Sequence, residues 1–181
     1  MNHIEYDPII VTKNRLCTIL AQSEEVRNAL DYKAIDVEKP YDPEDPLTLV
    51  WNCIYPVLKD LDTITSSDPQ ILIGLNSSPS YIDPRKIECT GSIIIVVHNN
   101  DLSSPEQFLR EDLAKDGFCA ASKADVIAHY VIKALSSQES RTWIGDIQWG
   151  LREEGALNNS MHYAVTLQFM LQEINIGNRG V

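Results

Sequence analysis

The stretch Lys86–His98, KIECTGSIIIVVH, limits the possible fold more than any other part of the chain. Its first half alternates, with apolar Ile87 and Cys89 on one side of an extended strand and polar residues on the other. Residues 93–97 are all apolar, so this half must be covered on both faces. The stretch predicts one long strand, half solvated and half buried, with helices of its own chain or a neighbouring subunit packed against the buried half.

The spacing of apolar residues and of helix-starting residues predicts the other elements. Helices are expected at residues 12–21, 23–30, 105–114 and 123–135, and strands at residues 70–76, 86–98, 143–151 and 161–174. Residues 152–160 are polar and predict a hairpin loop. Residues 47–55 fit a short helix and an apolar extended segment equally well.

This order of elements predicts an α+β fold with a largely antiparallel four-stranded sheet made of two hairpins. The helix at residues 123–135 is expected to pack on one face of the sheet, and the N-terminal helices complete the domain. A chain of 181 residues can bury such a core as a single domain, 1–181. Its expected parts are N-terminal helices (1–35), an acidic Pro-rich loop (36–46), an α+β core (47–174) and a loose tail (175–181).

The charge and the cysteines narrow the class of protein. The formal net charge of -11 disfavours general attraction to nucleic acid phosphates. The four cysteines form no CxxC pair, so they are expected to be buried thiols in a reducing compartment. The first residues carry no signal-peptide pattern and no apolar run is long enough to span a bilayer, so no membrane association is expected.

No motif of nucleophilic, phosphate-binding or metal-dependent catalysis is present in the sequence, so we expect no enzyme activity, no cofactor and no metal. A metal site or a hydrolase site is the alternative. His98 and His162 each lie at the end of a predicted strand, and with Asp101 they could form a metal site or a hydrolase site. The close ligand spacing typical of metal sites is missing, which favours ordinary histidines at the edge of the sheet.

Aromatic and charged residues near the predicted third strand are the candidates for an interface. Trp143 and Trp149 are expected on one side of that strand, where they would be core, part of a protein interface, or the ligand face of a binding or adaptor module. The candidate interface residues are Trp143, Trp149, Arg152, Glu153, Glu154 and His129.

Several segments together resemble the tail terminator and tail completion proteins of tailed bacteriophages. These are WNCIYPVLKDLD, QILIGLN, IECTGSIIIVVH, KADVIAHYVIKAL, WIGDIQWG and HYAVTLQFML. In that family an aliphatic strand leads to a helix that opens with a basic residue, a small residue and Asp, here Lys123, Ala124 and Asp125. The resemblance covers the chain from about residue 47 onward.

The resemblance implies a structural virion protein of the phage neck, assembled in the host bacterial cytoplasm. It implies a ring, a homohexamer, that caps the tail tube and joins it to the head connector. Its partners would be the major tail tube protein and the connector or stopper protein, while DNA passes through the lumen without specific binding. A head-closure stopper, another connector ring and a non-viral bacterial adaptor module are the alternatives.

Overall fold

The computed structural model describes residues 7–31, 42, 44–79, 86–102, 122–157 and 161–175. Its helices and short 3-10 turns are α1 (Pro8–Gln22), α2 (Glu24–Leu30), η1 (Pro46–Leu49), η2 (Leu61–Thr63), α3 (Asn99–Leu102), α6 (Lys123–Leu135) and α7 (Gln138–Ile144). Its strands are β1 (Ile54–Tyr55), β2 (Gln70–Pro79), β3 (Lys86–His98), β4 (Ile147–Ala156) and β5 (His162–Asn175). The helix expected at 105–114, the tail after residue 175 and most of the loop 36–46 lie outside the described residues.

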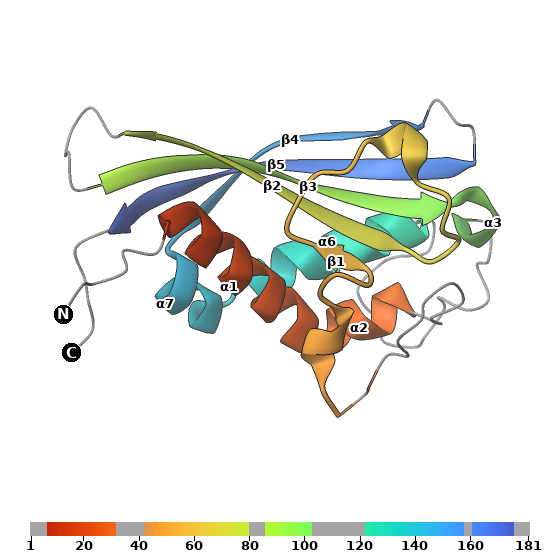
Figure 1. The fold of residues 1–181 in the computed structure, drawn as a ribbon, viewed down its shortest axis with the longest axis horizontal. Coiled ribbons are helices and arrows are strands. Elements are labelled where there is room, and N and C mark those ends of the chain that lie inside the picture. The colour runs from red at the N-terminus through yellow and green to blue at the C-terminus, as the bar shows by residue number, and fades with distance from the viewer. Residues whose placement is uncertain are drawn as a thin grey trace.

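The sheet has five strands in the order β1-β2-β3-β5-β4 (Figure 1). The two expected hairpins, β2 with β3 and β4 with β5, are antiparallel, and β3 also pairs antiparallel with β5. The fold is therefore α+β, as predicted, but the sheet is mixed and not four-stranded. The additional strand β1 has two residues and runs parallel to β2. Residues 47–55 contain both expected alternatives, because η1 precedes β1.

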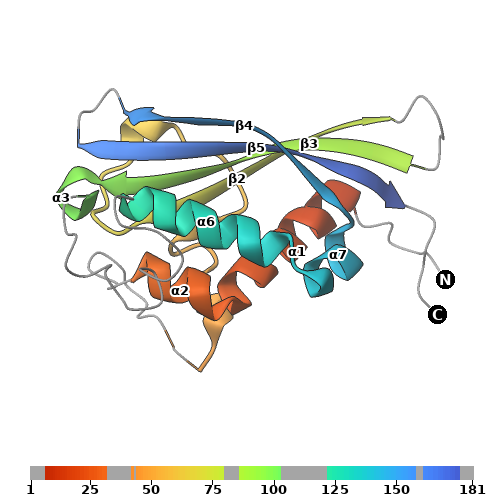
Figure 2. The same ribbon diagram turned by 180° about the vertical axis from the view of Figure 1, so that it is seen from behind.

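Helices α1, α2, α6 and α7 lie on one face of the sheet (Figures 1 and 2). Helix α6 has the predicted bounds and packs against β3 and β5. Helix α1 begins four residues earlier than expected, because the Asp7 carboxylate accepts a hydrogen bond from the Ile9 amide at 2.8 Å. Ser23 separates α1 from α2, as its hydroxyl caps the second helix. One layer of helices thus buries one face of the sheet.

The long strand β3 confirms the pattern of its sequence. Ile93, Ile95 and Val97 are fully buried in the main core beneath the helices. Val96 points to the opposite face and is also buried, in a second cluster with Ile64. The connection from β1 to β2 supplies Ile64 and covers this end of the outer face, so the chain itself closes both faces of the apolar half. Towards the other end of β3, Thr90 on the outer face is exposed, and Glu88 and Ser92 are partly exposed.

The region of residues 143–160 differs from the expectation. Trp143 belongs to α7, and β4 begins only at Ile147. Gly145 joins the two elements with a φ of 82°, a conformation that glycine adopts readily. The polar residues 152–156 continue β4 and pair with β5 instead of forming a loop. The prediction of a loop from the polarity of these residues was wrong, because an edge strand with one solvated side tolerates charged residues.

Candidate interface site

Among the strands that the structure describes, β4 lies at one edge of the sheet, next to β5. It is exposed along most of its length. An edge strand presents unpaired backbone amides and carbonyls on its outer side, so it can pair with another chain unless charged side chains or a bulge prevent it. Here the predicted interface residues Arg152, Glu153 and Glu154 are all exposed on β4.

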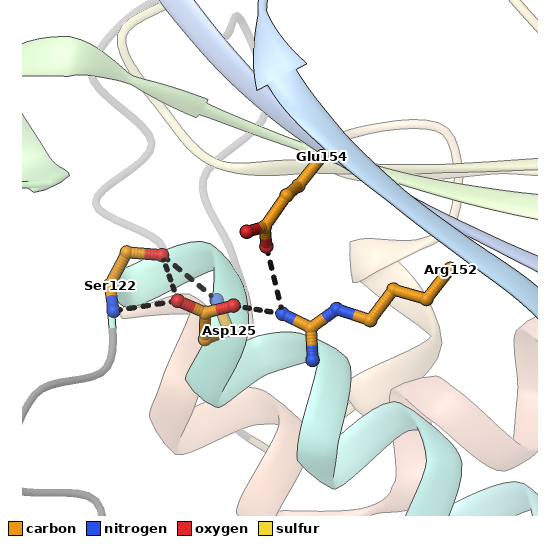
Figure 3. Close-up of polar contacts among 4 residues, drawn as sticks. All are labelled: Ser122, Asp125, Arg152 and Glu154. Atoms are coloured by element: carbon orange, nitrogen blue, oxygen red, sulfur yellow. Dashed lines mark hydrogen bonds and ion pairs between the residues drawn. The ribbon is translucent and has the colours of Figure 1, made fainter.

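A polar cluster fixes this edge to the helix layer (Figure 3). Asp125 accepts hydrogen bonds from the Ser122 amide at 2.8 Å and from the Ser122 hydroxyl at 2.7 Å, and the Ser122 hydroxyl accepts one from the Asp125 amide. The other oxygen of Asp125 pairs with the Arg152 guanidinium, which lies 3.3 Å from Glu154 Oε2. Asp125 thus caps α6 and anchors β4 at the same time.

Tyr163 on β5 borders this cluster, and its pKa reports the local electrostatics. Desolvation raises the pKa of the Tyr163 phenol, and the carboxylates of Glu154 and Asp125 raise it further. The Arg152 guanidinium acts in the opposite direction. In this cluster two carboxylates, those of Asp125 and Glu154, share the single guanidinium of Arg152.

Trp143 and Trp149 do not share one face. Trp149 packs against the core, with its indole N–H donating to Ser136 Oγ at 3.0 Å and its ring 5.9 Å from that of Phe169. Trp143 lies on α7 and is 45% exposed. The expectation of one tryptophan face is wrong because a helix and a turn, not a continuous strand, separate the two residues.

Sequence reasoning missed Leu151, which is 57% exposed on β4. The register of β4 against β5 shifts between Trp149 and Arg152. Two residues of β4, Gly150 and Leu151, lie opposite one residue of β5, Gln168, so β4 carries one additional residue and the alternation of faces is interrupted. A large apolar residue directly before a charged run was the signal that could have identified it.

His129 lies on α6 one turn after Asp125, on the same side of the helix. Its ring contacts that of Tyr130 in an edge arrangement with 5.3 Å between centroids. The side chain is partly buried. On β4, Arg152 and Glu154 point towards Asp125 at the start of α6, whereas Glu153 between them points to the opposite face of the sheet. Trp149 is partly buried against the core.

The two histidines at strand ends do approach each other, with ring centroids 5.1 Å apart. His162 is buried and its Nε2 lies 3.0 Å from the carbonyl oxygen of Ser66, while His98 Nδ1 accepts a hydrogen bond from the Asn100 amide. Asp101 pairs with Lys123 at 3.9 Å. Within the described ranges no group of three metal-ligating side chains comes together. These interactions hold the connection between β1 and β2, and helix α3, against the end of β3 and the start of β5.

No protein-family model matches the chain, and no curated protein matches it. Among the residues that the structure describes, none of the helices has both the length and the apolar character needed to cross a membrane. Function is therefore inferred from the residues and their geometry.

Proposed function

We propose that the protein is a structural virion protein of the phage neck: a tail terminator that forms a ring, caps the tail tube and joins it to the head connector. It acts through contacts between surfaces and catalyses no reaction. The observation that supports this function most is the open β4 edge, where Leu151 is exposed on a strand that pairs on one side only.

The composition of this edge suits contacts between subunits. Leu151 offers an exposed apolar group, and Arg152, Glu153 and Glu154 follow it along the strand with charge, a combination that also occurs where the apolar core of an interface meets its polar rim. Trp143, on the helix that leads into β4, adds a second exposed apolar group. Subunits of a ring contact one another head to tail, so each edge meets a different surface of the next copy.

The net charge of -11 is compatible with a lumen through which DNA passes without binding. A head-closure stopper or another connector ring would use the same features, and only a binding assay with tail tubes separates these roles. The adaptor alternative needs a ligand face that contains both Trp143 and Trp149. It is less well supported, because Trp149 is packed against Phe169.

The test compares Leu151→Asp with Met161→Asp, a matched control because Met161 is 58% exposed and lies outside β4. Purified protein is mixed with tail tubes and viewed by electron microscopy. Wild type and Met161→Asp should cap tube ends with rings. Leu151→Asp should leave the ends bare, because a charge at the centre of an interface costs about 2 kcal/mol or more per contact.

Two outcomes would count against the proposal. If wild-type protein stays monomeric and leaves tube ends bare, the tail terminator role is wrong. If rings form but join head connectors and not tubes, the stopper alternative is correct. Circular dichroism of each variant shows that a loss of capping does not come from unfolding.

A further inference from the structure

A polar pocket of about 560 Å³ lies beside β1, at the sheet edge opposite β4. Its volume is within the range of roughly 300–1,000 Å³ that is typical of small-molecule sites. The turn before β1 and the connection from β1 to β2 form its walls, and the start of β2 closes it. The lining includes Trp51, Tyr55, Lys59, Asp68 and Gln70.

Two hydrogen-bond acceptors among the lining residues are buried. Gln70 is 4% exposed, and its Oε1 has no hydrogen-bond partner within the described part of the chain. Asp68 is 5% exposed and adds a carboxylate to the same pocket. A buried carbonyl oxygen without a donor is costly and uncommon in native proteins. A ligand that carries an N–H donor would satisfy the Gln70 oxygen, and a positive charge on that ligand would complement the Asp68 carboxylate.

The same pocket carries a cation and two aromatic rings. Lys59 Nζ lies 3.1 Å from the centroid of the Tyr55 ring, and burial lowers the pKa of this lysine. Lys59 forms no ion pair with any residue that the structure describes. Trp51 is 60% exposed, with its backbone at a φ of 72°. An anionic group on a ligand would complement Lys59, and an apolar group could pack on the Trp51 indole.

We propose that this pocket binds a free amino acid in its zwitterionic form. The ligand's ammonium group donates to Gln70 Oε1 and Asp68, its carboxylate pairs with Lys59, and its side chain lies against Trp51. The Lys59 ammonium then faces the ligand's carboxylate, and the Asp68 carboxylate faces the ligand's ammonium. Each charge on the protein therefore has an opposite charge beside it and not a like charge. This site is separate from the β4 edge and does not depend on the proposed function.

Titration calorimetry on the wild-type protein tests the proposal with three probes. These are L-phenylalanine, L-phenylalaninamide, which lacks the carboxylate, and N-acetyl-L-phenylalanine, which lacks the ammonium charge. We expect L-phenylalanine to bind and each derivative to bind at least about tenfold more weakly, because each loses one charged hydrogen-bonding group. The proposal is overturned if L-phenylalanine does not bind, or if either derivative binds as tightly.

Two lysine variants locate the site. Lys59→Met should bind the amino acid and its amide equally, because the partner of the carboxylate is gone. Lys133→Met removes a lysine that pairs with Glu25 on the helix layer, outside this pocket, and should behave as wild type. A Lys59→Met protein that still prefers the amino acid over the amide contradicts the assignment of Lys59, and with it the proposed binding mode.

Discussion

Gly91 on β3 shows how one residue permits the close packing of the sheet. A Cβ atom at this position would lie 2.5 Å from Phe169 Cζ, 2.6 Å from Leu75 Cδ2 and 2.8 Å from the Gly74 carbonyl oxygen. Because one of these atoms belongs to the backbone, rotation of a side chain cannot make enough room. Gly155 on β4 differs, since a Cβ there would meet nothing within 4 Å.

These two glycines give a matched pair of variants. Gly91→Ala should lower the free energy of unfolding by about 1–3 kcal/mol through overpacking. Gly155→Ala should change it little, or raise it by up to about 1 kcal/mol, because alanine restricts the unfolded chain. Urea denaturation followed by circular dichroism measures both. Equal midpoints for the two variants would show that the space around Gly91 is not tight.

The buried thiols make stability depend on alkaline pH. Burial raises the pKa of Cys17 to about 12 and that of Cys89 to about 11, from an ordinary value of 9.0. Burial also raises the pKa of Cys53. Each folded-state pKa lies above the unfolded one, so the stabilising contribution is complete below about pH 9 and is lost as the pH rises towards the folded values.

The urea midpoint should therefore be constant between pH 7 and 8 and fall steadily from pH 9 to pH 11. Over the same range, a thiol reagent should modify these three cysteines slowly in the folded protein and rapidly in urea. A midpoint that rises above pH 9 would contradict burial of the thiols.

At the scale of elements, Asp125 joins the start of α6 to β4. Its carboxylate completes the capping box with Ser122 and pairs with Arg152. Asp125→Ala should cost about 1–2 kcal/mol of stability, mostly from the lost helix cap. Asp146→Ala is the control, because Asp146 pairs with Arg141 at 3.5 Å on the surface, where ion pairs contribute little. Urea denaturation that shows equal losses for both variants would contradict a capping role.

Elements set by local signals could be predicted from the sequence, and those set by distant pairing could not. The bounds of α6 follow from its apolar spacing, and β3 and β5 follow from their alternation. The two-residue strand β1 has no periodicity of its own and exists because it pairs with β2. In the same way, one pocket contains Trp51, Lys59 and Gln70 because the turn before β1 and the connection from β1 to β2 bring them together.

The candidate interface was predicted in part. The charged residues 152–154 predicted a solvated segment, and in the structure they lie on an edge strand. The positions of Trp143 and Leu151 could not be predicted, because a helix, a turn and a register shift occupy a stretch that alternates like a strand. A hydrophobic pattern cannot distinguish a helix, a turn and a strand with a register shift when each spans only a few residues.

At the scale of the whole molecule, the sheet has one face covered by helices and the other covered at one end only (Figures 1 and 2). Both faces of the apolar half of β3 are closed by the chain itself, so assembly does not need to bury that half. What assembly can bury is the β4 edge, with Leu151 and Trp143 exposed beside it. We therefore expect self-association at the edge of the sheet and not at its face.

Sedimentation velocity over a range of protein concentrations tests this account most directly. The chain has a mass of 20.4 kDa, and the account predicts a main species of about six times that mass for the wild type and for Met161→Asp. Leu151→Asp should sediment as a folded monomer. A wild-type protein that remains at 20.4 kDa at every concentration, or a Leu151→Asp variant that assembles as well as wild type, would contradict it.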